Sequence, residues 1–421
     1  MKLNDFIFNS PTPYHAADNA AEILSEAGFT RLYEGEKWQI QKGKGYFTVK
    51  DGSAIIAFKA GEEFSFNIAA SHSDSPCFKL KKGTLISDNY KKFNVEKYGG
   101  GIIYSWLDRP LTVAGRLIVK DGDALESVLF KSKHNFVIPS VAIHFNRNVN
   151  DGVKFDAQRD TSAIESILDK TSLESEISEF TRGNEVVDAD LYLVCDERPF
   201  VCGAADELIS TPRADDLTSA FASIKALEKS APKAINVVFI ANNEEVGSMT
   251  KAGAASTFLS DVLRRVALAL GKTEEDYACA LDGSFMLSCD NAHAVHPNKP
   301  ELSDPASRVG LGGGVVIKHH GNMNYTTDGF SSAVIKTVFD KANVKYQDFY
   351  MRSDLPCGGT LGAISGTHVS IRSADIGIAQ LAMHSAVETF AATDETEIEK
   401  GLTAFFSVAF RPVNEKFLIV W

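Results

Sequence analysis

The chain has 421 residues, of which 44% are hydrophobic and 23% are charged. This length predicts two or three domains with a large core, and the composition excludes disordered and collagen-like proteins. Acidic residues outnumber basic ones by 55 to 43, a formal net charge of -12, which argues against nucleic acid or an anionic membrane as a partner.

The first residues lack the basic flank and apolar centre of a signal peptide, and no apolar run approaches the roughly 18 residues of a spanning helix. We therefore expect a cytoplasmic protein. Its 6 cysteines are scattered without a Cys-x-x-Cys pair, which favours reduced thiols over disulfides or thiolate metal sites. Any metal would need other ligands.

A helix is expected between Pro11 and Gly28, because apolar residues recur there at helical spacing and Gly28 is placed to end it. Three β-rich runs follow it, GYFTVK, SAIIAFKA and FSFNIAASH. The last run ends abruptly in His72-Ser73-Asp74, so polar side chains follow a buried strand.

The residue pattern changes from about Lys82 to Arg198. Strand-length runs and hairpin-like turns such as Asp121-Gly122 indicate an antiparallel β module there. The runs are GGGIIYSWL, LTVAGRLIVK, SVLFK, FVIPSVAIHF and ADLYLVC. Because α/β alternation resumes afterwards, we interpret residues 82–205 as an inserted domain. The catalytic domain would then be formed by residues 1–81 and 206–421.

The rest of the chain alternates helical stripes with apolar runs. A stripe from Leu217 to Leu227 precedes INVVFIA, a run that predicts a strand covered on both faces and ends at Asn242-Asn243-Glu244-Glu245. Stripes around Phe258 and Val334 and the run YACALDGSFMLSCD repeat the pattern, so we predict an α/β fold, a parallel or mixed sheet with helices on both faces. Near the end, residues 394–397 have capping-box spacing ahead of a final helix, and FLIVW is expected to form a last strand.

Ionisable side chains lie against strongly apolar stretches at five places, where an unpaired charge is costly unless a partner or a metal compensates it. Sites in open α/β sheets form beyond the carboxyl ends of strands, so these clusters could converge. Each also has a structural interpretation, since an aspartate pair could cap a helix, a glutamate pair could lie in a solvated turn, and a histidine could belong to the core. The clusters are His72 with Asp74, Asp215 with Asp216, Glu244 with Glu245, Asp290 with His293, and His384.

Two histidines and several carboxylates, without cysteine, match the sites of dinuclear hydrolases that use zinc, cobalt or manganese. Two cations about 3.5–4 Å apart repel, so one carboxylate must bridge them while others offset their charge. In the Glu244-Glu245 pair, one carboxylate can bind metal while the other takes a proton from the attacking water. The spacing of His72 and Asp74 gives a liganding imidazole a carboxylate for its other N–H.

Five segments, in this order, resemble the motifs of the aspartyl aminopeptidase-type family of dinuclear zinc metallopeptidases. They are SHSDSP (71–76), TPRADDL (211–217), NNEEVGS (242–248), DNAHAVHPN (290–298) and QLAMHS (380–385). The resemblance covers almost the whole chain, including GGGIIYSWLDRPL and SVAIHFNRNVN in the inserted domain. It implies a phosphorylase/hydrolase-like α/β fold with two zinc ions per subunit, for which cobalt or manganese are possible substitutes.

The resemblance also implies the metal ligands. Asp215 would bridge the two ions. His72 and Asp290 would complete one site, and Glu245 and His384 would complete the other.

Two further roles follow from the same resemblance. Glu244 would be the general base, and Asp74 would orient the imidazole of His72. The bridging motif commonly has Asn after the Asp, whereas Asp216 follows Asp215 here, which leaves the choice of bridge to the surroundings.

Substrate-binding positions implied by the family are His144, His296, Lys318 and Tyr325. His144 matches a histidine that reaches the active site of a neighbouring subunit, although a buried structural histidine is an equal alternative. Lys318 could pair with a substrate carboxylate, with a solvated strand end as its alternative. The segment continues His319-His320, a departure from the family pattern. The family further implies a homo-oligomer, a tetrahedral dodecamer built from dimers through the inserted β domain.

The sequence therefore predicts a metal-dependent aminopeptidase that removes the N-terminal residue of peptides, preferentially Asp or Glu. One alternative is the same machinery acting on neutral residues. Another is a catalytically idle assembly protein, which would have no chemical need to retain Glu244. A nucleotide-binding enzyme would rest only on the glycines of VGLGGGVVIK, where an apolar run follows instead of a helix-opening phosphate loop.

Overall fold

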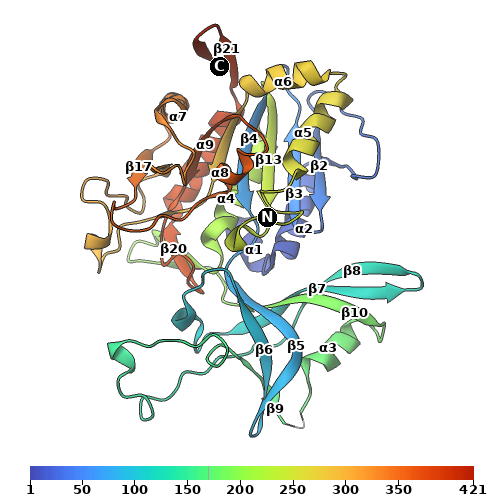
Figure 1. The fold of residues 1–421 in the computed structure, drawn as a ribbon, viewed down its shortest axis with the longest axis vertical. Coiled ribbons are helices and arrows are strands. Elements are labelled where there is room, and N and C mark those ends of the chain that lie inside the picture. The colour runs from blue at the N-terminus through green and yellow to red at the C-terminus, as the bar shows by residue number, and fades with distance from the viewer. Residues whose placement is uncertain (169) are drawn as a thin grey trace.

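The computed structural model describes residues 1–168 and 170–421, and it has an upper part built on a nine-stranded sheet (Figure 1). Strand β13 pairs in parallel with β4 and antiparallel with β3, so the sheet is mixed, as predicted. In sheet order the strands are β1 (Thr30–Arg31), β2 (Gly45–Lys50), β3 (Ala54–Lys59), β13 (Ile235–Ala241), β4 (Phe66–His72), β14 (Phe285–Cys289), β18 (Arg372–Gly377), β16 (Val315–His319) and β17 (Tyr346–Tyr350).

Helices cover both faces of this sheet. One hydrophobic cluster includes α1 (Leu3–Asn9), α2 (Pro13–Glu26), α4 (Ala214–Lys229), α7 (Gly329–Ala342) and α9 (Ala392–Phe406), and the opposite cluster includes α5 (Phe258–Ala269), α6 (Glu274–Asp282) and α8 (Leu361–Ser365). Alternate residues of β13 divide between the two clusters, Val238 and Ile240 on one side and Val237 and Phe239 on the other. The prediction that INVVFIA is covered on both faces is confirmed.

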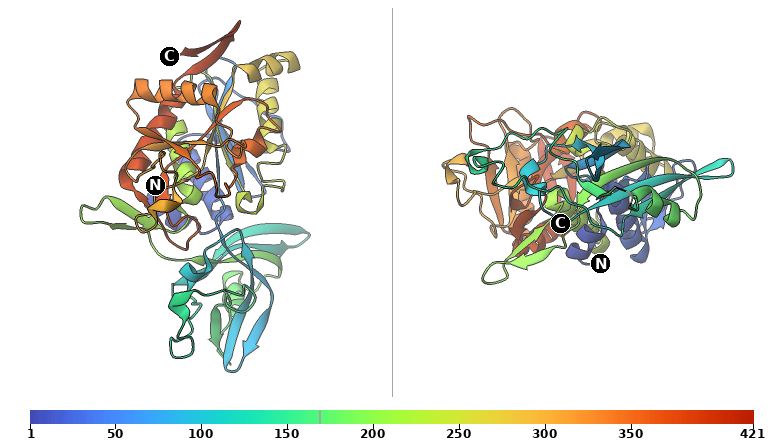
Figure 2. Two further views of the ribbon diagram at one scale, coloured as in Figure 1. Left: turned by 60° about the vertical axis from the view of Figure 1, so that its left-hand side comes forward. Right: turned by 90° about the horizontal axis from the view of Figure 1, so that it is seen from below.

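The lower part is a six-stranded antiparallel sheet (Figures 1 and 2). Its strands, in sheet order, are β8 (Ala124–Lys131), β7 (Leu111–Asp121), β10 (Val186–Cys195), β5 (Cys77–Ser87), β6 (Tyr90–Tyr98) and β9 (Ile164–Ile167), and α3 (Leu173–Phe180) packs against it. The predicted hairpin turn after Asp121 joins β7 to β8. Strand β5 already begins at Cys77, so the domain boundary that we propose at residue 82 lies inside it.

A five-stranded sheet stands beside the nine-stranded one and carries several segments of the site. Its strands are β11 (Phe200–Cys202), β12 (Leu208–Thr211), β20 (Glu388–Ala391), β19 (Ala379–Leu381) and β15 (Ala292–His293). The β11–β12 hairpin projects from the side of the molecule in Figure 2. The predicted last strand is β22 (Lys416–Val420), which pairs with β21 (Ala409–Val413).

Two runs predicted as strands are not strands. Residues Ile103–Trp106 form a 3-10 helix, and the run from Phe136 contributes only isolated bridges. Pro139 has no N–H for a ladder, and the side chains that follow it are solvated, with Phe145 87% exposed. Their apolar character therefore marks a surface of this chain and not its core.

The predicted capping box is wrong. Helix α9 begins at Ala392, and its N-cap Ala391 makes no side-chain hydrogen bond. The carboxylate of Asp394 instead accepts the N–H groups of Gly312 and Gly314 at 2.8 and 2.9 Å. These glycine amides are thus satisfied inside the protein, which removes the basis for a phosphate-binding loop.

Two other features of the fold agree with the expectations from the sequence. The cysteines are free. Gly28 adopts a φ of 84° just after α2, as a helix-ending glycine does. Within the described residues, no helix has the length and apolar character needed to cross a membrane.

Candidate metal centre

The carboxyl ends of three neighbouring strands supply most of the candidate ligands. Strands β13, β4 and β14 are adjacent and parallel through β4, so their carboxyl ends meet at one edge of the sheet. His72 is the last residue of β4, Asp290 follows β14, and the 3-10 helix η3 (Glu244–Val246) lies just beyond β13. The sequence indicated that clusters after strand ends could converge, and these three segments lie at the same edge of the sheet.

Two irregular segments bring the other ligands to the same place. Asp215 lies at the start of α4, where it and Asp216 have non-helical backbone angles. His384 lies between β19 and β20 with a φ of 66°, in the left-handed region. Neither aspartate caps the helix by its side chain, and His384 is 32% exposed, so the helix-cap and core-histidine alternatives do not hold.

Asp215 stands between the two imidazoles. Its Oδ1 is 3.5 Å from Nε2 of His72, and its Oδ2 is 3.6 Å from Nε2 of His384. Nε2 of His384 is also 3.4 Å from Oε1 of Glu245. Asp215 belongs to two groups of possible metal ligands. One group also contains His72 and Asp290, and the other contains Glu245 and His384; within each group the ligand atoms lie within 4.8 Å of one another. A third group joins His72 to Glu244 and Glu245.

The donor set fits zinc. Among the described residues, the buried oxygens Asp215 Oδ1 and Glu245 Oε1 have no hydrogen-bond partner. A buried carboxylate oxygen without a partner is costly, and a cation would satisfy it. Histidine nitrogens and carboxylate oxygens are ordinary zinc ligands. The Glu245 side chain is only 4% exposed, so the solvated-turn alternative for this pair does not hold.

Asp74 holds the main chain of the glutamate pair by hydrogen bonds. Its buried carboxylate accepts the backbone N–H groups of Glu244 at 3.0 Å and Glu245 at 3.2 Å, and the hydroxyl of Tyr98 at 2.7 Å. The sequence led us to expect this carboxylate to accept the N–H of His72. Nδ1 of His72 lies instead 2.9 Å from the main-chain carbonyl of Asp74 and 3.6 Å from its carboxylate. The Asp74 carboxylate accepts from Glu244, Glu245 and Tyr98 instead, which explains why His72 contacts the carbonyl.

Asp216 has a different position from Asp215. It is fully buried, and its Oδ2 accepts the backbone N–H of His72 at 3.3 Å. Burial, opposed by the charge of His72, raises the pKa of Asp216 well above its usual range. Because Asp216 belongs to neither group of ligand atoms, the geometry favours Asp215 as the shared residue.

Burial also governs the ionisation of the two glutamates. It raises the pKa of Glu244 to about 7, with His72 opposing and Asp290 adding to the effect. Burial, reinforced by Asp215, raises the pKa of Glu245 well above its usual range. At Asp215 burial acts in the same direction but is outweighed by contact with His72, so the pKa of that carboxyl is lowered.

Lys318 is buried beside the ligands, and the interpretation of it as a solvated strand end is therefore wrong. It is 2% exposed, and its Nζ donates to the carbonyl of Asn291 at 3.2 Å and lies 3.7 Å from Oδ1 of Asp290. The same Nζ lies 5.0 Å from the ring centroid of Tyr325. Two of the expected substrate-binding residues thus lie together next to a candidate ligand.

The two histidines after Asp290 differ in position. His296 is exposed, and its Nδ1 accepts the N–H of Asn298 at 3.2 Å. His293 is also solvent-exposed, at the end of β15, but desolvation by the surrounding groups, together with the charge of Lys318, lowers its pKa, and it also interacts electrostatically with Asp215. Both histidines line one cavity. His293 therefore lies within electrostatic range of Lys318 and Asp215.

His144 lies on the surface of the six-stranded part and is exposed. The alternative of a buried structural histidine is therefore wrong for this chain. The exposed apolar side chains around it are Val141, Ile143 and Phe145. Its proposed role in a neighbouring subunit needs a second chain.

Glu388 is a site residue that the sequence analysis missed. It is 2% exposed at the start of β20, and its carboxylate accepts the backbone N–H groups of His384 and Asp215. The only signal was a carboxylate in a run that otherwise looks like an ordinary strand. Burial, reinforced by Asp215, raises the pKa of Glu388 to about 8.

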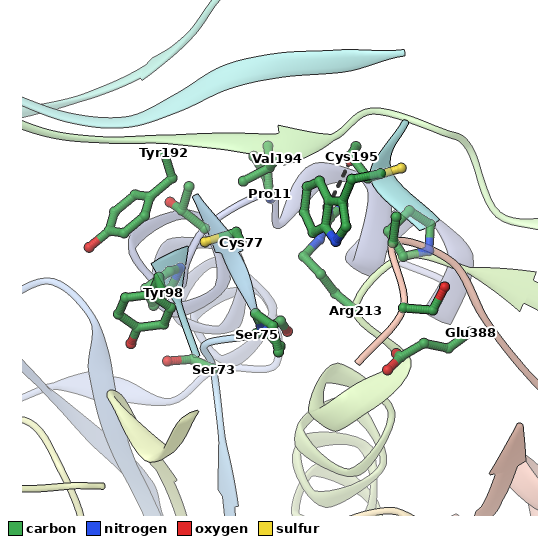
Figure 3. A pocket seen from close by; sticks show the side chains of 17 residues that line it. Pro11, Ser73, Ser75, Cys77, Tyr98, Tyr192, Val194, Cys195, Arg213 and Glu388 are labelled. Atoms are coloured by element: carbon green, nitrogen blue, oxygen red, sulfur yellow. Dashed lines mark hydrogen bonds between the residues drawn. The ribbon is translucent and has the colours of Figure 1, made fainter. Parts of the chain in front are cut away.

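A pocket between the two parts adjoins these residues (Figure 3). Ser73, Arg213 and Glu388 line it from the upper part, and Tyr98 and Tyr192 from the six-stranded sheet. The side chain of Arg213 is tied to the main chain through the carbonyls of Cys195 and Ile7, at 2.9 and 3.2 Å. The pocket is therefore lined by residues of both parts, next to the ligand-bearing segments.

A mixed α/β sheet whose strand ends present histidines and carboxylates around one shared aspartate defines the class of metal-dependent hydrolases. A family model described as Aminopeptidase I zinc metalloprotease (M18) matches residues 6–406. The chain is 41% identical over 424 residues to the probable M18 family aminopeptidase 2 of Clostridium acetobutylicum, a match covering 97% of this chain and 98% of the relative. It is 37% identical over 448 residues to the aspartyl aminopeptidase of Dictyostelium discoideum, covering 93% and 92%.

The fold of the chain is also similar to that of a solved aminopeptidase structure. The S. cerevisiae mApe1 dodecamer has a TM-score of 0.81 and 26% identity, with 96% of this chain and 95% of that chain covered. The chain belongs to the M18 family, and it is a zinc metallo-aminopeptidase. The resemblance stated from the motifs is confirmed, and the idle-protein alternative is set aside.

Proposed function

We propose that this aminopeptidase removes N-terminal Asp or Glu from peptides, using two metal ions that share Asp215. The observation that carries the two-ion proposal is the position of Asp215, which belongs to both groups of ligand atoms. His72 and Asp290 would hold one ion, and Glu245 and His384 the other. Zinc is the ion that the family description names, and cobalt or manganese would suit the same donors.

The residues divide the work of hydrolysis. When bound, the ions supply Lewis-acid chemistry that polarises the scissile carbonyl and lowers the pKa of the attacking water. Glu244 takes the proton from that water and passes it to the leaving amine. Asp74 fixes the main chain of Glu244 through the 3.0 Å hydrogen bond.

The acidic preference rests on Lys318. This buried cation lies beside Asp290, and a bound ion would engage the charge of that carboxylate, which leaves the Lys318 ammonium to pair with a substrate carboxylate. Tyr325 and His293 would complete the surroundings of that substrate group. The name of the D. discoideum relative supports the same preference.

A substrate panel tests this proposal. The reconstituted enzyme would be assayed on p-nitroanilides of Asp, Glu, Asn, Ala and Leu, and the Asn compound separates charge from shape. We expect kcat/KM for Asp to exceed that for Asn and Leu by about 10²-fold, since a buried cation discriminates strongly against an uncharged partner. A higher value for Leu would replace the acidic preference with a neutral one and leave the metal chemistry intact.

The assembly is part of the proposal. The exposed apolar side chains of Val141, Ile143 and Phe145 and the projecting β11–β12 hairpin, with Phe200 and Val201 about half exposed, offer surface for subunit contacts. The similarity to the mApe1 dodecamer supports a tetrahedral dodecamer built from dimers, in which His144 would reach a neighbouring site. The free cysteines fit the reducing cytoplasm expected from the sequence.

A further inference from the structure

We infer that Glu388 is a positioning residue that sets the spacing between the two halves of the metal centre. This inference rests on the proposed two-ion function. Oε1 of Glu388 accepts the backbone N–H of His384 at 2.7 Å, and Oε2 accepts the backbone N–H of Asp215 at 3.0 Å. One carboxylate thus joins the residue shared by both ligand groups to the histidine of one group.

The two segments that it joins need such support. His384 adopts a φ of 66°, a conformation that costs a non-glycine residue free energy and persists only where the surroundings impose it. Asp215 lies outside helical geometry although α4 begins beside it. Among the hydrogen bonds of the described residues, only the Glu388 side chain reaches both main chains.

Glu388 is itself held firmly. It begins β20, where it pairs with Thr211 of β12, and it is 2% exposed. Nε2 of Gln380 lies 3.4 Å from Oε1 of Glu388, and Oε1 of Gln380 accepts from Nδ2 of Asn291 at 3.1 Å. Asn291 follows the candidate ligand Asp290, so the network behind Glu388 extends to the other ion site.

Figure 3 shows Glu388 on the Arg213 side of the pocket, across from Ser73 and Tyr98. Its carboxylate bonds to backbone amides and belongs to none of the groups of ligand atoms. It therefore acts on the metal centre through the main chain.

Glutamine is the informative substitution because it keeps the shape of Glu388 and turns one acceptor into a donor. The new amide N–H would face the N–H of either His384 or Asp215, and that main chain would have to move. Loss of a supporting residue of this kind commonly costs about 10–100-fold in metal affinity. We expect Glu388→Gln to bind one zinc ion tightly and the second with a Kd raised by that factor.

Asp394→Asn is the matched control. Asp394 is another fully buried carboxylate that accepts two backbone N–H groups, those of Gly312 and Gly314, and no candidate ligand is among its partners. It should lose thermal stability as Glu388→Gln does but keep both zinc affinities. Metal-free proteins would be titrated with zinc against a chelator, after circular dichroism has shown that each is folded. The visible spectrum of the cobalt-loaded proteins would report ligand geometry.

Two zinc affinities within twofold of wild type in folded Glu388→Gln, with an unchanged cobalt spectrum, would overturn the inference. If that variant does not fold, Glu388→Asp takes its place: one methylene shorter, it cannot reach both N–H groups, and the same criterion applies. A wild-type chain that binds a single ion would overturn the two-ion proposal instead, so the two failures are distinguishable.

Discussion

The carboxylate of Asp74 accepts the backbone N–H of Glu244 at 3.0 Å and thereby fixes the turn that carries the proposed base. The same carboxylate accepts the N–H of Glu245 at 3.2 Å. Since adjacent glutamates at a strand end project in different directions, holding both amides in one place gives each side chain a defined target. Asp74 therefore acts more on the glutamate pair than on His72, whose Nδ1 is closer to its carbonyl than to its carboxylate.

Asp74→Asn should accordingly lower kcat/KM about 10–100-fold, because its amide group cannot accept every N–H that the carboxylate accepts. Tyr98→Phe removes only one donor from Asp74 and should cost less. Steady-state kinetics at saturating zinc would measure both. A larger loss for Tyr98→Phe would place the important contact at the phenol and not at the turn.

The neighbours Glu244 and Glu245 should respond differently to the same substitution. Glu244→Gln cannot accept the proton, and loss of a general base costs about 10²–10⁴ in rate, so we expect near-normal zinc content with a collapsed kcat. Glu245→Gln should lose metal from one site. Zinc analysis and kinetics on both variants would decide the assignment. If Glu244→Gln emptied a site and stayed active at saturating metal, the two roles would be exchanged.

The sequence located the strand ends of the site because each was an apolar run followed at once by polar residues. His72 after FSFNIAAS, Glu244 after INVVFIA and Asp290 after FMLSC all follow this pattern, and the parallel neighbours β13, β4 and β14 bring them together. Periodicity and strand-end chemistry are local properties, so a single sequence contains them.

Contacts with distant main chain could not be predicted in this way. Glu388 and Asp394 are buried carboxylates that each accept a backbone N–H from far away in sequence, that of Asp215 and that of Gly312, and any residue type could supply those. Asp394 even stood in a spacing that favours a helix cap. The run that ends at the exposed Phe145 was misassigned as a strand for a different reason, because apolar surface residues resemble core residues in a sequence.

His144 provides a test of the assembly. If it reaches a neighbouring active site, His144→Phe should lower kcat sharply while zinc content and the light-scattering mass stay at wild-type values. His134, a second histidine of the same module, offers a matched control, and His134→Phe should be nearly silent. A wild-type chain that is fully active as a monomer at high dilution would exclude both the assembly and the contribution across subunits.

Lys318→Met should reduce the preference for Asp over Leu substrates, because the apolar stem stays buried while the cation is lost. Since Nζ of Lys318 lies 3.7 Å from Asp290, zinc content has to be measured in parallel. We expect kcat/KM for Asp to fall about 10²-fold with little change for Leu. An equal fall on both substrates would assign Lys318 to general binding or to support of Asp290.

Metal removal should make the stability of the protein depend strongly on pH. Burial raises the pKa of Glu244 to about 7 and of Glu388 to about 8, both above the value of about 4.3 for an unfolded chain. A carboxyl with a raised pKa in the folded state binds its proton more tightly there, so it stabilises the fold at low pH and loses that contribution as pH rises through the folded pKa. The lowered pKa of Asp215 has the opposite effect on stability, but it is one group against the two glutamates.

The metal-free protein should therefore melt at progressively lower temperature between about pH 5 and pH 8, the window between the unfolded and folded pKa values. Cations favour the ionised carboxylates, so the zinc-loaded protein should lose much less over the same range. Thermal melts with chelator and with zinc, at matched ionic strength, would measure the difference in Tm, which should widen as pH rises. A gap that is constant from pH 5 to 8 would mean that the buried glutamates do not carry the coupling between metal binding and folding.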